Sequence, residues 1–233
     1  MKAIVLALRE VTSDVAALLR FAPAIALLAL AGEFQQHVAE IKLGMFASRE
    51  AFTALQGSTI RLGFGAIKVA ALLVAAFWAA RKLAALRIET RPNLNGPVDW
   101  SRLMTAAVLT IVPLLAVLLA PIADPNVRLA LLIAVMIAGI PASTIAMDAL
   151  FGQARQSVRQ SLRLRPLPPL FDIVTALPLA PAMYLHMQNH NWAFGAEPAV
   201  VWALMVWDSI LVALMALLMG ALVYRWYRPA PTP

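Results

Sequence analysis

Runs of apolar residues long enough to cross a lipid bilayer are the feature that most restricts how this chain can fold. Residues 62–80 and 199–224 each approach or exceed the ~20 residues that a transmembrane helix requires. Further apolar runs, some of them interrupted by proline or charge, cover residues 15–32, 103–120, 127–147 and 167–187. The pattern predicts an all-α, polytopic integral membrane protein with six transmembrane helices.

The composition agrees with this class of protein. Of the 233 residues, 62% are hydrophobic and only 13% are charged, whereas soluble domains have about 45–50% apolar and about 25% charged residues. The chain has no internal repeat and no low-complexity linker. We therefore expect a single transmembrane domain that covers residues 1–233.

Two amphipathic segments accompany the predicted spans. Residues 1–19 alternate apolar and charged side chains at helical spacing, which predicts an N-terminal helix lying in the membrane interface. Residues 33–46 place two glutamines, a histidine, two carboxylates and a lysine between apolar runs. This stretch predicts an outer-face amphipathic segment between the first two spans.

The distribution of positive charge predicts the orientation in the membrane. With six spans, fourteen Lys and Arg residues fall on one side of the membrane and four on the other. Because cytoplasmic loops carry the excess of Lys and Arg, both termini are expected in the cytoplasm. The Ala- and Arg-rich composition, with little Lys, suggests a GC-rich bacterial genome, so the expected location is a bacterial inner (plasma) membrane, as a multi-pass protein.

The densest polar pattern consists of Glu33, His37 and Glu40, which stand at positions i, i+4 and i+7 and so share one helical face. Such a face can bind a divalent metal or relay a proton. The alternative, which we favour from the sequence, is the solvated face of an interfacial helix that serves as a lid or docking face. His186 and His190 stand at i and i+4 at the outer end of the fifth predicted span. They could close a metal site with the first group, or they could be ordinary boundary histidines, so no cofactor is expected and a metal is the alternative.

Lys68 and Asp208 lie well inside predicted spans, and Asp172 lies just inside the fifth. A charge at the centre of a membrane helix costs about 2.5–3.5 kcal/mol on insertion scales, so each should face protein or water and have a partner. We expect Lys68 and Asp208 to form a structural ion pair, with a transport or relay role as the alternative. Asp172 lies in a proline-interrupted span, a feature that some transporters use to bind ions.

The remaining patterns narrow the function mostly by exclusion. The basic row Arg155, Arg159 and Arg163 fits anionic lipid headgroups better than nucleic acid. The absence of cysteine excludes thiolate metal sites and a cysteine nucleophile, and no phosphate loop, nucleophile elbow or HExxH motif is present.

These observations favour a non-enzymatic role over catalysis. The expected function is that of an accessory subunit of a membrane complex, or of a small lipid- or solute-handling protein. The expected partners are the lipid bilayer and other membrane subunits or further copies of the chain, and not nucleic acid. One alternative is a secondary transporter or channel that uses Lys68 and Asp208. A second alternative is an outer-face metal-dependent enzyme that uses Glu33, His37 and Glu40.

Overall fold

The computed structural model describes residues 2–88, 94–120, 127, 130–131, 134–135, 140–152 and 176–227. Within these residues every regular element is a helix and none is a strand, which confirms the predicted all-α class. The chain divides into two compact units. The first comprises Met1–Leu83 and Pro169–Trp226, and the second comprises Ala84–Pro168 and Tyr227–Pro233.

The first unit begins with a broken helix. Helix α1 (Lys2–Phe21) ends just before Pro23, and α2 (Pro23–Lys42) starts at that proline and leaves at an angle of 92°. Proline lacks an N–H and has a fixed φ, so it suits the first position of a helix but interrupts a continuing one. The predicted first span, residues 15–32, is therefore divided by this bend.

Helix α2 closes in a turn that requires glycine. Gly44 has a φ of +71°, its N–H donates to Ile41 O at 3.0 Å, and the N–H of Met45 donates to Glu40 O at 3.0 Å. These two bonds are the pair that terminates a helix in the Schellman motif. The chain then enters the short helix α3 (Arg49–Leu55), which is capped by the Ser48 hydroxyl accepting from Ala51 N at 3.1 Å.

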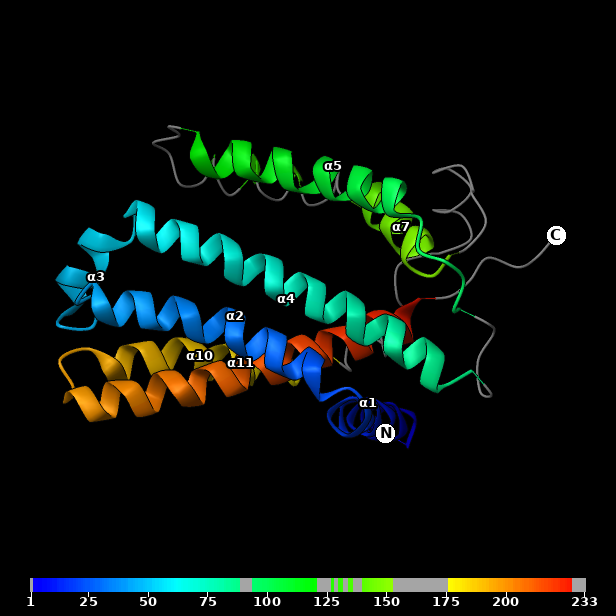
Figure 1. Ribbon diagram of the computed structural model, residues 1–233, viewed down its shortest axis with the longest axis horizontal. Coiled ribbons are helices and arrows are strands. Elements are labelled where there is room, and N and C mark those ends of the chain that lie inside the picture. The colour runs from blue at the N-terminus through cyan, green and yellow to red at the C-terminus, as the bar shows by residue number, and fades with distance from the viewer. Residues whose placement is uncertain are drawn as a thin grey trace. The chain divides into compact units, whose positions relative to one another are not determined.

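Three longer helices complete this unit: α4 (Thr59–Leu86), α10 (Leu179–Ala193) and α11 (Pro198–Trp226). Helices α10 and α11 lie side by side, and α11 also packs along α2 (Figure 1). Small residues allow the closest approaches. A Cβ added at Gly220 of α11 would lie 2.7 Å from Ala76 O of α4, and one at Gly32 of α2 would meet the Cβ of Ala71.

The second unit contains α5 (Trp100–Leu119) and α7 (Ile140–Leu150) (Figure 1). The Asp99 carboxylate caps α5 by accepting from Arg102 N at 3.1 Å. The N–H of Asp99 donates to Ala149 O at 3.0 Å, which ties the start of α5 to the end of α7.

Two helices, α4 and α11, are long and apolar enough to cross a membrane, and the bent pair of α1 and α2 raises the number to three if it counts as one span. Six spans are not supported. Helix α5, over the predicted third span, counts as a shorter apolar helix over Trp100–Pro113 among the described residues. The predicted fourth span (127–147) and fifth span (167–187) lie partly outside the described residues. Two or three apolar helices are compatible with a membrane protein.

Candidate functional site

The polar face of α2 is buried inside the first unit. Glu33, His37 and Glu40 have exposed fractions of 0%, 1% and 0%. The sequence interpretation of this face as the solvated side of an interfacial helix is therefore wrong. The physical reason is that charged partners from α4 and polar partners from α11 meet this face, so burial does not leave the charges unpaired.

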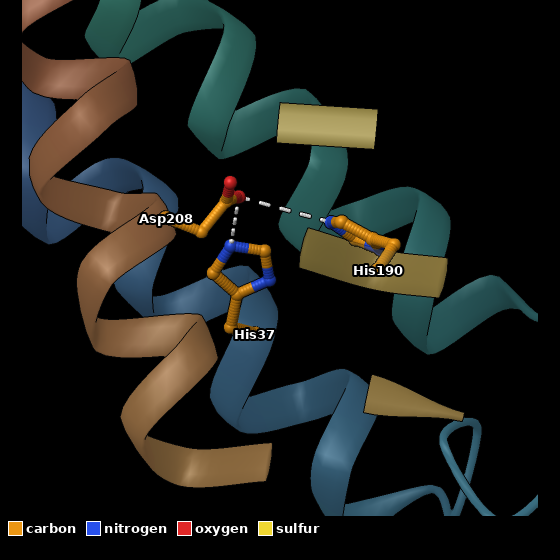
Figure 2. Close-up of side chains that lie close together, drawn as sticks. All are labelled: His37, His190 and Asp208. Atoms are coloured by element: carbon orange, nitrogen blue, oxygen red, sulfur yellow. Dashed lines mark hydrogen bonds and ion pairs between the residues drawn. The ribbon is translucent and has the colours of Figure 1, made fainter. Parts of the chain in front are cut away.

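Asp208 of α11 is the centre of the site. Its Oδ2 atom lies 3.0 Å from Nε2 of His37 on α2, 2.7 Å from Nδ1 of His186 and 3.8 Å from Nε2 of His190, both on α10. Figure 2 shows His37 and His190 approaching this carboxylate from two different helices. The chain has three histidines in all, and all three surround this one carboxylate oxygen.

A second layer of contacts orients these groups. Glu40 Oε2 lies 3.3 Å from Nδ1 of His37, which leaves the Nε2 atom of that imidazole directed at Asp208. The amide of Asn189 donates to Oδ1 of Asp208 at 2.7 Å, so that only Oδ2 faces the histidines. Gln36 in turn donates to Glu40 Oε1 at 2.8 Å. The His37 ring and the carboxylates of Glu40 and Asp208 are thus each held in one orientation.

Two cations of α4 balance the carboxylates of α2. Nζ of Lys68 lies 2.8 Å from Glu33 Oε1, and Nε of Arg61 lies 3.0 Å from Glu40 Oε1. Lys68 and Asp208, which we expected to pair with each other, thus have different partners. Position along the chain placed them at similar depth but could not show that Glu33 lies nearer to Lys68.

Four polar atoms of the site have no hydrogen-bond partner although they are buried: Glu33 Oε2, His190 Nε2, Gln36 Oε1 and Asn189 Oδ1. Buried polar atoms are usually paired, so such atoms call for an explanation such as an ion. Among the described residues, two groups of three have ligand atoms within 4.8 Å of one another, as a bound metal ion requires. The first group is His37, His190 and Asp208, and the second is Glu33, His186 and Asp208.

Aromatic rings cover His190 on the side of α3. The ring centroids of Phe46 and Phe52 lie 5.6 Å and 6.0 Å from that of His190, and Phe52 also packs against Phe194. Burial, and after it the neighbouring His37, lowers the pKa of His190 from its usual 6.5 to about 4. This imidazole is therefore neutral near pH 7 and keeps a lone pair for a ligand.

Sequence reasoning found most of this site but missed two members. Arg61 entered only the count of positive charge, and Asn189 went unnoticed between two histidines. The signal available for Arg61 was its spacing of seven residues from Lys68, which places both on one face of α4. Asp172, Arg155, Arg159 and Arg163 lie outside the described residues.

Comparison with family models, with curated proteins and with solved structures finds no match to this chain. The observations on this chain alone therefore define its class. Over its described residues it is all-helical, with two or three helices that could span a membrane. Its first unit contains a buried cluster of histidine and carboxylate groups that could hold a metal ion.

Proposed function

We propose that this protein is a metal-dependent membrane hydrolase, in which His37, His190 and Asp208 hold a divalent transition metal ion such as Zn²⁺. The observation that carries the proposal is the convergence of all three histidines on Oδ2 of Asp208 in a buried position. Imidazole and carboxylate are the ligands that Zn²⁺ takes in sites without cysteine.

The ligand number favours catalysis over a purely structural role. Structural zinc sites have four protein ligands, whereas catalytic sites have three and leave one position for water or substrate. Here two imidazoles and one carboxylate form such a set. Glu40 against Nδ1 of His37 supplies the carboxylate–histidine contact that orients metal-binding imidazoles.

The charges of the site also fit one divalent ion. Three carboxylates (Glu33, Glu40 and Asp208) and two cations (Arg61 and Lys68) leave a net charge of −1 when the histidines are neutral. One divalent ion changes this to +1, and a bound hydroxide brings it to zero. A second divalent ion would leave a buried excess of positive charge, which is unfavourable in a medium of low polarity.

The residues around the metal can divide a hydrolytic reaction among them. The ion would lower the pKa of a bound water to about 7. Glu33, whose Oε2 is unpartnered, would accept a proton from that water, and Lys68 would stabilise negative charge on the substrate. Water oxygen bonds to the carbonyl carbon, the proton passes to the leaving alcohol or amine, and the ester or amide bond breaks. No other co-reactant is needed.

The decisive experiment is elemental analysis of protein purified from its native membrane without chelators. A stoichiometric amount of Zn, Mn, Fe or Co is expected. Hydrolysis of chromogenic acyl esters should be lost on treatment with EDTA and return with added metal. Metal-free protein that neither takes up these ions nor rises in melting temperature with them would exclude the proposal. At a free metal concentration of about 100 times Kd, binding to the folded state alone adds about 2.7 kcal/mol to the free energy of unfolding.

A second candidate is a transporter, and one observation favours it. The buried ion pair of Glu33 and Lys68 connects helices α2 and α4, both of which belong to candidate spans. Intramembrane charges of this kind mark ion pathways in transport proteins. Asp208→Asn should then abolish an ion flux into proteoliposomes while the protein stays folded, whereas an unchanged flux would remove this candidate.

As part of the proposal we retain a bacterial inner membrane, six spans and both termini in the cytoplasm; the distribution of Lys and Arg supports them. Because the chain has no cysteine, single cysteines can be labelled without background. A membrane-impermeant maleimide should label Thr53→Cys in spheroplasts, and Ser101→Cys only after lysis. The reverse pattern would overturn this orientation.

A further inference from the structure

We propose that a groove between α2 and α4 binds an anionic phospholipid, with one acyl chain in the groove and the phosphate against Lys42. The groove has a volume of about 420 Å³, which is within the range of about 300–1,000 Å³ that ligand sites occupy. None of the metal-site residues lines it, so this inference goes beyond the proposed hydrolase and is independent of it.

The walls of the groove suit a hydrocarbon chain. Phe34 and Val38 line it from α2, and Ile60 and Phe64 line it from α4. Ile60 and Phe64 are 55% and 37% exposed, on a helix that is long and apolar enough to span a membrane. In a bilayer these side chains face lipid, and a hollow between them would be filled by an acyl chain.

One end of the groove carries the charge of Lys42, and that end lies at the start of the candidate span, where a lipid headgroup would be. Lys42 is in the last turn of α2, and Ile60 is in the first turn of α4, so both lie where the candidate span begins. Phe34 lies eight residues earlier, ~12 Å along the helix at 1.5 Å per residue. Within the described part of the chain, no carboxylate lies within 4.0 Å of the Lys42 ammonium. A phosphate at Lys42 would therefore meet a cation that no carboxylate of those residues has neutralised.

The groove is held open by a side chain that bridges its two helices. Nε2 of Gln35 donates to Phe64 O on α4 and to Gly32 O on α2, each at 2.8 Å. Gln35 also lines the groove. A site whose walls are fixed before the ligand arrives loses less free energy to ordering on binding.

The test is native mass spectrometry of the purified full-length protein mixed with equal amounts of phosphatidylglycerol and phosphatidylcholine of the same chain length. The wild type should retain phosphatidylglycerol about fivefold over phosphatidylcholine, as expected for one lysine near the phosphate. Lys42→Gln should lose this preference but still bind lipid. Val38→Trp, which fills the groove, should bind neither lipid there.

Matched controls lie on α4, outside the groove. Lys82→Gln should keep the preference for phosphatidylglycerol, and Ile67→Trp should keep the bound lipid. If Val38→Trp fails to fold, Ile60→Trp fills the groove from the exposed side of α4. Equal retention of the two lipids by the wild type, or undiminished binding by the tryptophan variants, would overturn the proposal. Metal content should be the same in all five variants.

Discussion

The Nε2 atom of His37 lies 3.0 Å from Oδ2 of Asp208, although 171 positions separate the two residues in the chain. This contact joins α2 to α11 at the point where His186 and His190 also arrive from α10. It brings the polar face of α2 and the histidine pair of α10 together in one buried site. The following four predictions test what that constellation and the packing around it do.

Replacing Asp208 by asparagine should remove the bound metal. The amide has a similar size but lacks the negative charge that draws a divalent ion, so metal retained after dialysis should fall at least tenfold. Ser209→Ala is the matched control, because Ser209 is the next residue of α11 and bonds only locally, donating to Met205 O at 2.7 Å. Elemental analysis measures both variants. Retention of metal by Asp208→Asn would contradict its role as a ligand.

Substitutions of the two histidines of α10 should weaken metal binding to different extents. His190 belongs to the ligand group with His37, and we expect His190→Ala to abolish stoichiometric metal binding. His186 approaches Asp208 at 2.7 Å through Nδ1 and orients it, so His186→Ala should weaken binding by the 10–100-fold typical of an orienting contact. Titration with Co²⁺, followed by its visible absorption, measures both. The reverse order would assign the metal to Glu33, His186 and Asp208.

Breaking the ion pair of Lys68 and Glu33 should cost stability. Lys68→Met removes the ammonium group beside the fully buried Glu33 carboxylate, whose Oε1 then keeps only Nε2 of His37 at 3.3 Å, and removal of one partner of a buried pair typically costs about 3–5 kcal/mol. The double variant with Glu33→Gln should recover most of this loss, because no charge is then left unpaired. Thermal unfolding in detergent measures the effect, and Lys82→Met serves as the control. An equally unstable double variant would show that the loss comes from packing.

Gly220 should tolerate no side chain. An added Cβ would lie 2.7 Å from Ala76 O and would also meet the Cβ of Ala79, both on α4. Overpacking of this kind costs about 1–3 kcal/mol, so Gly220→Ala should lower the melting temperature. Gly63→Ala is the control, since nothing lies within 4 Å of its added Cβ and alanine favours a helix over glycine. Equal melting temperatures would mean that α4 and α11 do not pack closely here.

Local sequence patterns predicted which segments form helices better than they predicted which side chains are buried. The apolar runs at residues 62–80 and 199–224 correspond to α4 and α11, and the spacing of Glu33, His37 and Glu40 correctly placed them on one helical face. Their burial could not be predicted from α2 alone, because it depends on Asp208 and Lys68 from distant segments. From the sequence of one helix, a polar face is expected to contact solvent, because the side chains of other helices that pair with it are not known.

The sequence predicts one span over residues 15–32, whereas the structure turns the helix through 92° at Pro23. The expected pair of Lys68 and Asp208 rests on both residues lying inside predicted spans, which gives no information about rotation around each helix axis. Rotation decides which neighbour a side chain meets, and here it directs Lys68 toward Glu33.

The hydrogen bond from Asn189 to Oδ1 of Asp208 has a consequence for coordination chemistry. A free carboxylate can bind a metal ion through both oxygens, but Oδ1 of this one accepts a hydrogen bond from the amide of Asn189. A metal ion bound as proposed would therefore meet Asp208 through Oδ2 alone. With two imidazoles as the other ligands, monodentate binding would leave a tetrahedral position open for an exchangeable molecule.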